Sequence, residues 1–246
     1  DLTEDKDLKF NADKILSLIT DKTRLLILIN PNNPTGSFVE KPEIDKLAEG
    51  LKKHPHVTIL SDEIYSRQIF DDKEMPTFFN YPELRDRLIV LEGWSKAYSM
   101  TGWRLGYTAA IKEIADAIDT IQSHSTSNPT TFAQYGAIAA LTSDQSEIDD
   151  MVEEYNIRRQ YVLGRLNTIA NISTIEPEGA FYFLINIEKT GIKSVNFAEK
   201  LLSRMQVATI PGVAFGNDQT IRISYATSLP VIKEGLDRLE EFCRAH

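Results

Sequence analysis

The chain has 246 residues, a formal net charge of −9, 42% hydrophobic residues and 9% aromatic residues. This length allows one large domain, or one and a half ordinary ones, with a substantial hydrophobic core. The negative charge and the absence of a long basic run argue against nucleic acid or an acidic membrane surface as a partner.

Cys243 is the single cysteine, so no disulfide can form within the chain and a reducing, cytoplasmic compartment is expected. The four histidines have no spacing typical of a metal site, so no metal is expected. No apolar run approaches the ~18 residues that a membrane span needs, and no signal peptide is visible.

The first 160 residues alternate between strand and helix patterns. Residues 1–7 are polar and predict a loop, and Asn11 can cap a short helix that carries Leu18 and Ile19. The apolar run 23–29 predicts a strand buried on both faces, as in a parallel sheet. Further strands are expected at 57–60, 88–91 and 104–108, and helices at 42–51, 82–87, 112–123, 130–141 and 145–169.

In the helix at 112–123, Ile121 is expected to face inward with its apolar neighbours. The pattern then changes to short strands separated by turns. These strands are expected at 172–175, 181–187, 207–210 and 220–225, with helices at 195–205 and 230–243. The sequence therefore predicts an α/β fold, with a mainly parallel sheet flanked by helices in residues 1–160 and a smaller α+β domain in residues 161–246.

Polar side chains follow the first three predicted strands. Asn33 follows the first, Asp62 and Tyr65 follow the second, and Lys96 follows the third. In an open parallel sheet, ligands bind beyond the carboxyl ends of the strands. An amide, a carboxylate, a phenol and an amine are the groups that a pyridine aldehyde needs around its ring. A lysine that loses its proton easily can form a Schiff base with a carbonyl.

Each of these residues also has an ordinary explanation. Asn33 is typical of a turn, Asp62 can cap a turn, and Tyr65 can be a core residue. Lys96 can be a solvated lysine, and Arg104 can form a surface ion pair. The order and spacing of the whole set favour the functional interpretation.

Three motifs carry a resemblance to a known family. They are Asn-Pro-Asn-Asn-Pro-Thr-Gly at 30–36, Ser-Asp-Glu-Ile-Tyr at 61–65, and Ser-Lys-Ala-Tyr-Ser-Met-Thr-Gly-Trp-Arg at 95–104. The chain resembles the class I/II aminotransferases, which are fold-type I pyridoxal-phosphate enzymes, essentially from end to end. The resemblance includes two further motifs, Pro-Glu-Gly-Ala-Phe-Tyr at 177–182 and Thr-Ile-Arg-Ile-Ser at 220–224. The resemblance implies that residues 1–160 form part of the large, cofactor-binding domain of that fold.

The resemblance also implies a role for each residue. Lys96 would bind the cofactor as a Schiff base and then move the proton between the substrate α-carbon and the cofactor. Asp62 would pair with the pyridine nitrogen and keep it protonated. Tyr65 and Asn33 would hydrogen-bond the phenolic oxygen of the cofactor. Lys96, Asp62 and Tyr65 are therefore the expected catalytic residues.

Two arginines and a serine complete the implied site. Arg104 would bind the cofactor phosphate, and Ser95 would add a hydroxyl to it. Arg222 would hold the substrate α-carboxylate, near Asn33, because its planar guanidinium suits a bidentate grip. Gly93 departs from the family, which often has Ser or Thr there, so one phosphate hydroxyl is missing.

The implied activity is transfer of an amino group from an amino acid to a 2-oxo acid, with aspartate and 2-oxoglutarate as the expected substrates. The loop 123–129 resembles an aspartate aminotransferase branch. Transaminases for aromatic, branched-chain or methionine substrates, a β-lyase, and a regulator that senses the cofactor are the alternatives. A homodimer is implied for the full-length enzyme. Whole members are longer, so the resemblance predicts that an N-terminal part is absent and that the fragment alone is inactive.

Overall fold

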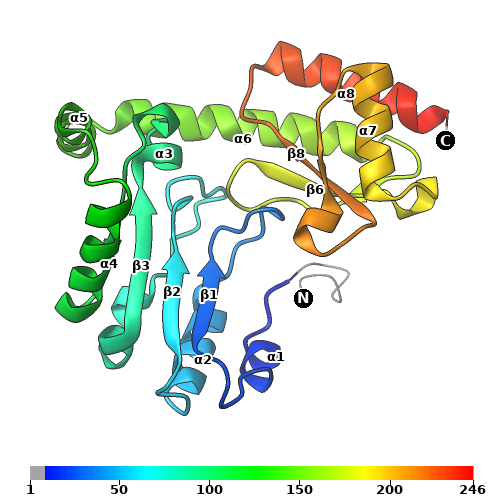
Figure 1. Cartoon of the computed structure of the whole chain (residues 1–246). Helices are drawn as coiled ribbons and strands as arrows, with labels where there is room; N and C mark the ends of the chain where they lie inside the picture. The colour runs from blue at the N-terminus through cyan, green and yellow to red at the C-terminus, as the bar shows by residue number, and fades with distance from the viewer. Residues whose placement is uncertain (1–8, 246) are drawn as a thin grey trace. The chain divides into compact units, whose positions relative to one another are not determined.

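The computed structural model describes residues 9–245, so the loop predicted at 1–7 lies outside the described residues. The chain divides into two compact units (Figure 1). We call the unit of residues 10–31 and 39–150 the sheet unit, and the unit that includes 32–38 and 151–245 the C-terminal unit. A boundary near residue 160 remains a prediction.

The sheet unit contains a four-stranded sheet in the order β1-β2-β3-β4. Its strands are β1 (Leu25–Ile29), β2 (Thr58–Asp62), β3 (Leu88–Gly93) and β4 (Gly106–Ala109). The first three are parallel, and β4 runs antiparallel to β3. The prediction of a mainly parallel sheet flanked by helices is confirmed.

The sheet unit contains five α-helices and three short 3-10 helices within its described residues. They are α1 (Ala12–Ser17), α2 (Lys41–Leu51), η1 (Phe78–Asn80), η2 (Pro82–Arg87), α3 (Trp94–Ala97), η3 (Thr101–Trp103), α4 (Lys112–Ser125) and α5 (Thr131–Thr142). The Asn11 side chain accepts a hydrogen bond from Lys14 N, so the predicted cap of α1 is confirmed. Helix α1 ends at Ser17, so Leu18 and Ile19 lie beyond the predicted helix.

The core of the sheet unit lies on one face of the sheet. Residues Ile44, Leu47 and Leu51 of α2 pack with Leu28 of β1 and Ile59 of β2. Burial of this many aliphatic side chains is the main stabilising contribution, at roughly 25 cal/mol per Å² of apolar surface.

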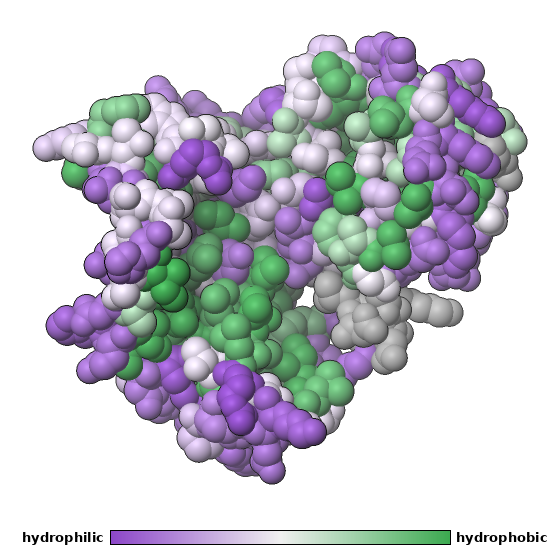
Figure 2. Space-filling view, viewed as in Figure 1, coloured by the Kyte–Doolittle hydropathy of each residue, from purple (hydrophilic) through white to green (hydrophobic). Residues whose placement is uncertain are grey.

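The expectation that the first strand is buried on both faces is wrong. Leu25 is 45% exposed and Ile27 is 57% exposed, because β1 is an edge strand and its helices pack on the face that carries Leu26 and Leu28. Figure 2 shows hydrophobic residues gathered over the strands of this sheet. Ile121 of α4 was also expected inward and is 70% exposed, because α4 has no fully buried residue.

The C-terminal unit contains a second sheet in the order β5-β6-β8-β7, in which all pairs are antiparallel. Its strands are β5 (Ser173–Thr174), β6 (Tyr182–Asn186), β7 (Ile210–Pro211) and β8 (Thr220–Ser224). Its other elements are most of α6 (Ser146–Leu166), η4 (Glu188–Thr190), α7 (Ser194–Met205), η5 (Gly212–Phe215) and α8 (Leu229–Arg244). The smaller α+β arrangement is confirmed.

Candidate active site

Asp62 is held at the carboxyl end of the central strand β2. It pairs with Ile29 of β1 and with Leu91 of β3. Its carbonyl oxygen accepts a hydrogen bond from Asn30 N at 3.1 Å, and the next residue, Glu63, donates from its backbone N to Leu91 O at 2.8 Å. The backbone on both sides of Asp62 is therefore fixed by neighbouring strands, which fixes the origin of its side chain.

The Asp62 carboxylate has no cationic partner among residues 9–245. Its hydrogen bond comes from Ile64 N, at 3.2 Å from Oδ1. Burial raises the pKa of this carboxyl, and the backbone hydrogen bond opposes the shift. A half-buried carboxylate without a cation favours a cationic ligand at this position.

Two further carboxyl groups lie close to Asp62. Glu63 is buried and accepts hydrogen bonds from the hydroxyls of Ser61 and Thr77, each at 2.9 Å. Glu92, near the end of β3, accepts one from Ser66 Oγ at 2.8 Å. Burial raises the pKa of Glu63, and it raises the pKa of Glu92 to about 7. This end of the sheet therefore concentrates negative charge.

Lys96 lies on the single-turn helix α3, which begins directly after β3. The sharp transition depends on Gly93, because a Cβ there would lie 3.0 Å from Gly106 Cα and 3.1 Å from Leu105 O. Gly93 pairs with Gly106 across β3 and β4. A side chain at position 93 would require the neighbouring backbone to move by a few tenths of an ångström. Lys96 is half-buried.

Tyr65 and Ser95 lie near Asp62 and Lys96 in the chain. Tyr65 lies in the turn after β2, and its side chain is buried with 4% exposure. Ser95 is half-buried on α3, and its carbonyl oxygen accepts a hydrogen bond from Thr101 Oγ1 at 2.8 Å. This bond joins α3 to the η3 turn that leads to Arg104.

Arg104 lies at the end of η3 and not in a strand as predicted, because β4 begins at Gly106. Its φ angle of 56° lies in the left-handed region, which is unfavourable for a residue other than glycine. Arg104 is exposed and lines a surface groove with Thr126, Asn128 and Thr130. A cation among hydroxyl and amide groups is a suitable anion-binding environment.

Asn33 and Arg222 form a second cluster, in the C-terminal unit. Arg222 Nη1 donates to Asn33 Oδ1 at 2.6 Å. The guanidinium carbon lies 4.5 Å from the centre of the Tyr182 ring and 5.0 Å from that of Phe215. Among residues 9–245 no carboxylate pairs with Arg222. The cation is therefore oriented by an amide and two rings, without an anion.

The turn that carries Asn33 is anchored within the same unit. Gly36 O accepts hydrogen bonds from Glu178 N at 2.8 Å and from Gly179 N at 2.9 Å. Gly36 has a φ of 71°, and a Cβ there would lie 2.4 Å from Pro177 Cβ. Arg159, fully buried on α6, donates to Pro177 O at 2.8 Å and so holds the loop segment that contacts Gly36.

The structure thus places the predicted residues in two groups. Asp62, Tyr65, Ser95, Lys96 and Arg104 belong to the sheet unit, and their segments follow the neighbouring strands β2 and β3. Asn33 and Arg222 belong to the C-terminal unit and are hydrogen-bonded to each other.

Four residues around these groups were not predicted from the sequence. Gln68 donates to the Lys96 carbonyl, Glu92 adds a carboxyl beside Asp62, and Tyr182 and Phe215 flank Arg222. Tyr182 lies within a motif of the resemblance, at 177–182, and could have been found there. Gln68 and Phe215 have no periodic signal in the sequence.

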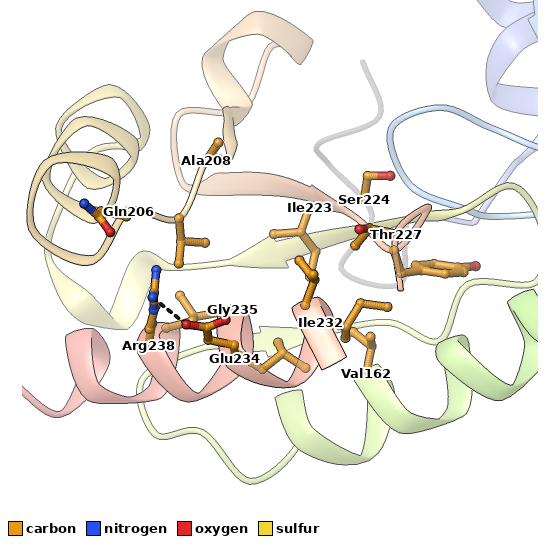
Figure 3. A pocket seen from close by; sticks show the side chains of 15 residues that line it. Val162, Gln206, Ala208, Ile223, Ser224, Thr227, Ile232, Glu234, Gly235 and Arg238 are labelled. Atoms are coloured by element: carbon orange, nitrogen blue, oxygen red, sulfur yellow. Dashed lines mark hydrogen bonds and ion pairs between the residues drawn. The ribbon is translucent and has the colours of Figure 1, made fainter. Parts of the chain in front are cut away.

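The C-terminal unit also contains a cavity of about 250 Å³, shown in Figure 3, that none of the predicted residues lines. Val162, Ile223 and Ile232 form part of its wall, and Arg238 and Glu234 form an ion pair of 2.6 Å beside it. Within residues 9–245 there is no cluster of three metal-ligating side chains and no helix long and apolar enough to cross a membrane.

The family model described as aminotransferase class I and II matches residues 1–239. The chain is 38% identical to an aspartate aminotransferase of Bacillus sp. strain YM-2, covering 98% of this chain and 63% of that protein. It is 40% identical to a Rickettsia prowazekii protein named "Probable aspartate/prephenate aminotransferase", covering 96% of this chain and 62% of the relative.

Solved structures agree with these relatives. The crystal structure of an aromatic aminotransferase from Pyrococcus horikoshii superposes with a TM-score of 0.92 at 35% identity, covering 97% of this chain and 65% of that one. The chain therefore spans less than two thirds of the length of the relatives it matches.

Proposed function

The chain belongs to the class I and II aminotransferases, and we propose that the whole protein transfers an amino group from an amino acid to a 2-oxo acid with pyridoxal 5′-phosphate. The observation that carries this proposal is that an amine and a carboxylate without a cationic partner lie at the carboxyl ends of two neighbouring parallel strands. Lys96 follows β3, and Asp62 ends β2, with Asp62 paired to Leu91 in the sheet.

The residues of the sheet unit fit this cofactor. Asp62 is a half-buried anion that lacks a cation within residues 9–245, which is what a protonated pyridine nitrogen requires. Arg104 lies exposed among hydroxyl and amide groups, which suits a phosphate. Ser95 is half-buried on α3 and adds a hydroxyl to the phosphate in this proposal.

Pyridoxal phosphate supplies an aldehyde and an electron-accepting ring when it is bound. Lys96 Nζ would hold the aldehyde and, once released, would carry the proton that leaves the substrate α-carbon. Asp62 would keep the ring nitrogen protonated. Tyr65 Oη and the Asn33 amide would hydrogen-bond the phenolic oxygen and favour its ionised form.

Arg222 holds the substrate α-carboxylate in this proposal. Its guanidinium has no carboxylate partner within residues 9–245, and Asn33 Oδ1 occupies only one of its five N–H donors. The remaining donors are available for a bidentate carboxylate. Asn33 would then contact both the cofactor and the arginine that binds the substrate.

We propose aspartate as the amino donor and 2-oxoglutarate as the acceptor, because two relatives carry aspartate in their names. Transamination of aromatic substrates is the second candidate, since a structural neighbour at 35% identity is an aromatic aminotransferase. A homodimer and a cytoplasmic location, both usual for the family, complete the proposal.

Substitution of Lys96 by alanine in the full-length protein tests the proposal. We expect aspartate–2-oxoglutarate transamination to fall by about 10⁴-fold or more, because no other residue replaces a covalent amine. The matched control is Lys112→Ala, since Lys112 is an exposed lysine paired with Asp116 on α4. Transamination by the Lys96 variant at the wild-type rate, with any amino donor from a panel of twenty, would refute the assignment.

A further inference from the structure

Gln68 connects the two segments that carry the proposed catalytic residues of the sheet unit. Its backbone N donates to Tyr65 O at 2.8 Å. Its side-chain Nε2 donates to Lys96 O at 3.0 Å. Gln68 is fully buried, with 0% exposure. One residue therefore links the turn after Asp62 to the backbone of the lysine.

The other half of the Gln68 amide is poorly satisfied. Its Oε1 is buried and has no hydrogen-bond partner in the described part of the chain. The same holds for Nε1 of Trp94, on α3. Buried polar atoms are nearly always paired, and each exception requires a reason. An apolar side chain at position 68 would avoid the cost of the unpaired oxygen but would lose the hydrogen bond to Lys96 O.

The lysine needs this support because α3 is a single turn. Helix α3 spans only Trp94–Ala97, so few of its backbone groups are paired within the helix. Lys96 O also accepts from the backbone N–H groups of Tyr98 and Ser99, the latter at a longer distance of 3.2 Å. The Gln68 amide is thus the side-chain contact that fixes the Lys96 carbonyl, and through it the direction of the Cα–Cβ bond.

We propose that Gln68 is a positioning residue for Lys96. The inference rests on the proposed function, in which Lys96 Nζ binds the cofactor aldehyde and carries a proton. The hydrogen bond from Gln68 Nε2 sets the orientation of the lysine without touching the cofactor or the substrate. A displacement of about 1 Å at a reacting group can cost on the order of 100-fold in rate.

The test compares Gln68→Met and Gln68→His in the full-length protein. Methionine has a similar size and removes both the donor and the unpaired oxygen. Histidine restores an N–H donor at a similar distance from the backbone. Gln219→Met is the matched control, because Gln219 is exposed and its side chain donates to Glu188 at 3.2 Å, in the C-terminal unit.

Two measurements are made on each variant. The apoprotein is mixed with pyridoxal phosphate, trapped with borohydride at timed intervals, and digested to measure the label on the Lys96 peptide by mass spectrometry. Urea unfolding of the apoprotein gives the stability of the same preparations.

For Gln68→Met we expect the Lys96 label to form at least tenfold more slowly, with an unchanged or higher urea midpoint. For Gln68→His we expect recovery to within about threefold of the wild-type rate. Wild-type labelling in the Met variant would overturn the inference. Equal slowing in the Met and His variants, or a loss of folding in both, would also overturn it, because packing would then explain the effect. A wild-type protein that is never labelled at Lys96 would instead refute the proposed function itself.

Discussion

The carboxyl cluster of the sheet unit and the Arg222 guanidinium of the C-terminal unit carry opposite charge. In the sheet unit, Asp62, Glu63 and Glu92 are carboxyl groups that receive hydrogen bonds from neutral donors. In the C-terminal unit, Arg222 is a cation that contacts an amide and two aromatic rings. Within residues 9–245, Asp62 has no cation and Arg222 has no anion.

The two groups also differ in how they hold their charge. Arg222 is oriented before any ligand arrives, by a 2.6 Å hydrogen bond and two ring contacts that are favourable to a cation. Asp62 has a fixed backbone but a poorly solvated carboxylate, whose pKa burial raises. The contacts in the C-terminal unit therefore stabilise the charge of Arg222. In the sheet unit, the charge of Asp62 lowers stability until a cation is bound.

Replacement of Asp62 by asparagine separates activity from stability in the sheet unit. We expect kcat of the full-length protein to fall by about 10³-fold, because an amide cannot keep the pyridine nitrogen protonated. We also expect the apoprotein to become more stable above neutral pH, because the desolvated charge is gone. Steady-state kinetics and urea unfolding at pH 8 measure the two effects.

Asp119→Asn is the control for this prediction, since Asp119 is exposed on α4. Its kinetics and stability should match those of the wild type. An Asp62→Asn variant that is both less active and clearly less stable would show that Asp62 has a stabilising contact and not an uncompensated charge.

Replacement of Arg222 by lysine tests the opposite group. Lysine keeps the charge but loses the planar, bidentate donor set and the contacts with the Tyr182 and Phe215 rings. We expect KM for the amino acid to rise by about 100-fold with a smaller change in kcat, because the lost interaction binds the ground state as well as the transition state.

Arg204→Lys, at an exposed position on α7, should leave KM unchanged. If KM for aspartate in Arg222→Lys stays near the wild-type value while kcat falls, then Arg222 does not bind the α-carboxylate. The comparison also predicts that this variant, unlike Asp62→Asn, gains no stability at pH 8.

Much of the fold was predictable because its signals are local. The apolar spacing of Ile44, Leu47 and Leu51 predicted α2 and its buried face, and Asn11 predicted the cap of α1. Residues 88–91 were predicted as a strand, and the structure extends this strand to Gly93. Motif order placed Lys96 and Asp62 after neighbouring strands, since parallel strands end at one edge of a sheet.

The errors and omissions have non-local causes. The exposure of Ile27 depends on which face of β1 the helices cover, and an apolar run does not encode this. The left-handed turn at Arg104 depends on how η3 meets β4. The Gln68–Lys96 hydrogen bond joins residues 28 apart in sequence, and no periodic pattern indicates it.

Glu92 provides the smallest and most specific test of the charge cost in the sheet unit. Burial raises its pKa to about 7, and the carboxyls of Glu63 and Asp62 add to the shift. The hydrogen bond from Ser66 opposes the shift, and Arg67 opposes it to a smaller extent. The folded protein therefore binds more protons than the unfolded chain between about pH 4.5 and pH 7, so this carboxyl lowers stability as pH rises through that window.

For Glu92→Gln we expect a gain in unfolding free energy over the wild type that is near zero at pH 4.5 and reaches about 2 to 3 kcal/mol at pH 8. Urea unfolding at both pH values measures the gain, and Glu113→Gln, on the exposed surface of α4, should show none. A gain of equal size at the two pH values would mean that Glu92 has the same pKa in the folded and the unfolded protein, with the hydrogen bond from Ser66 offsetting its burial.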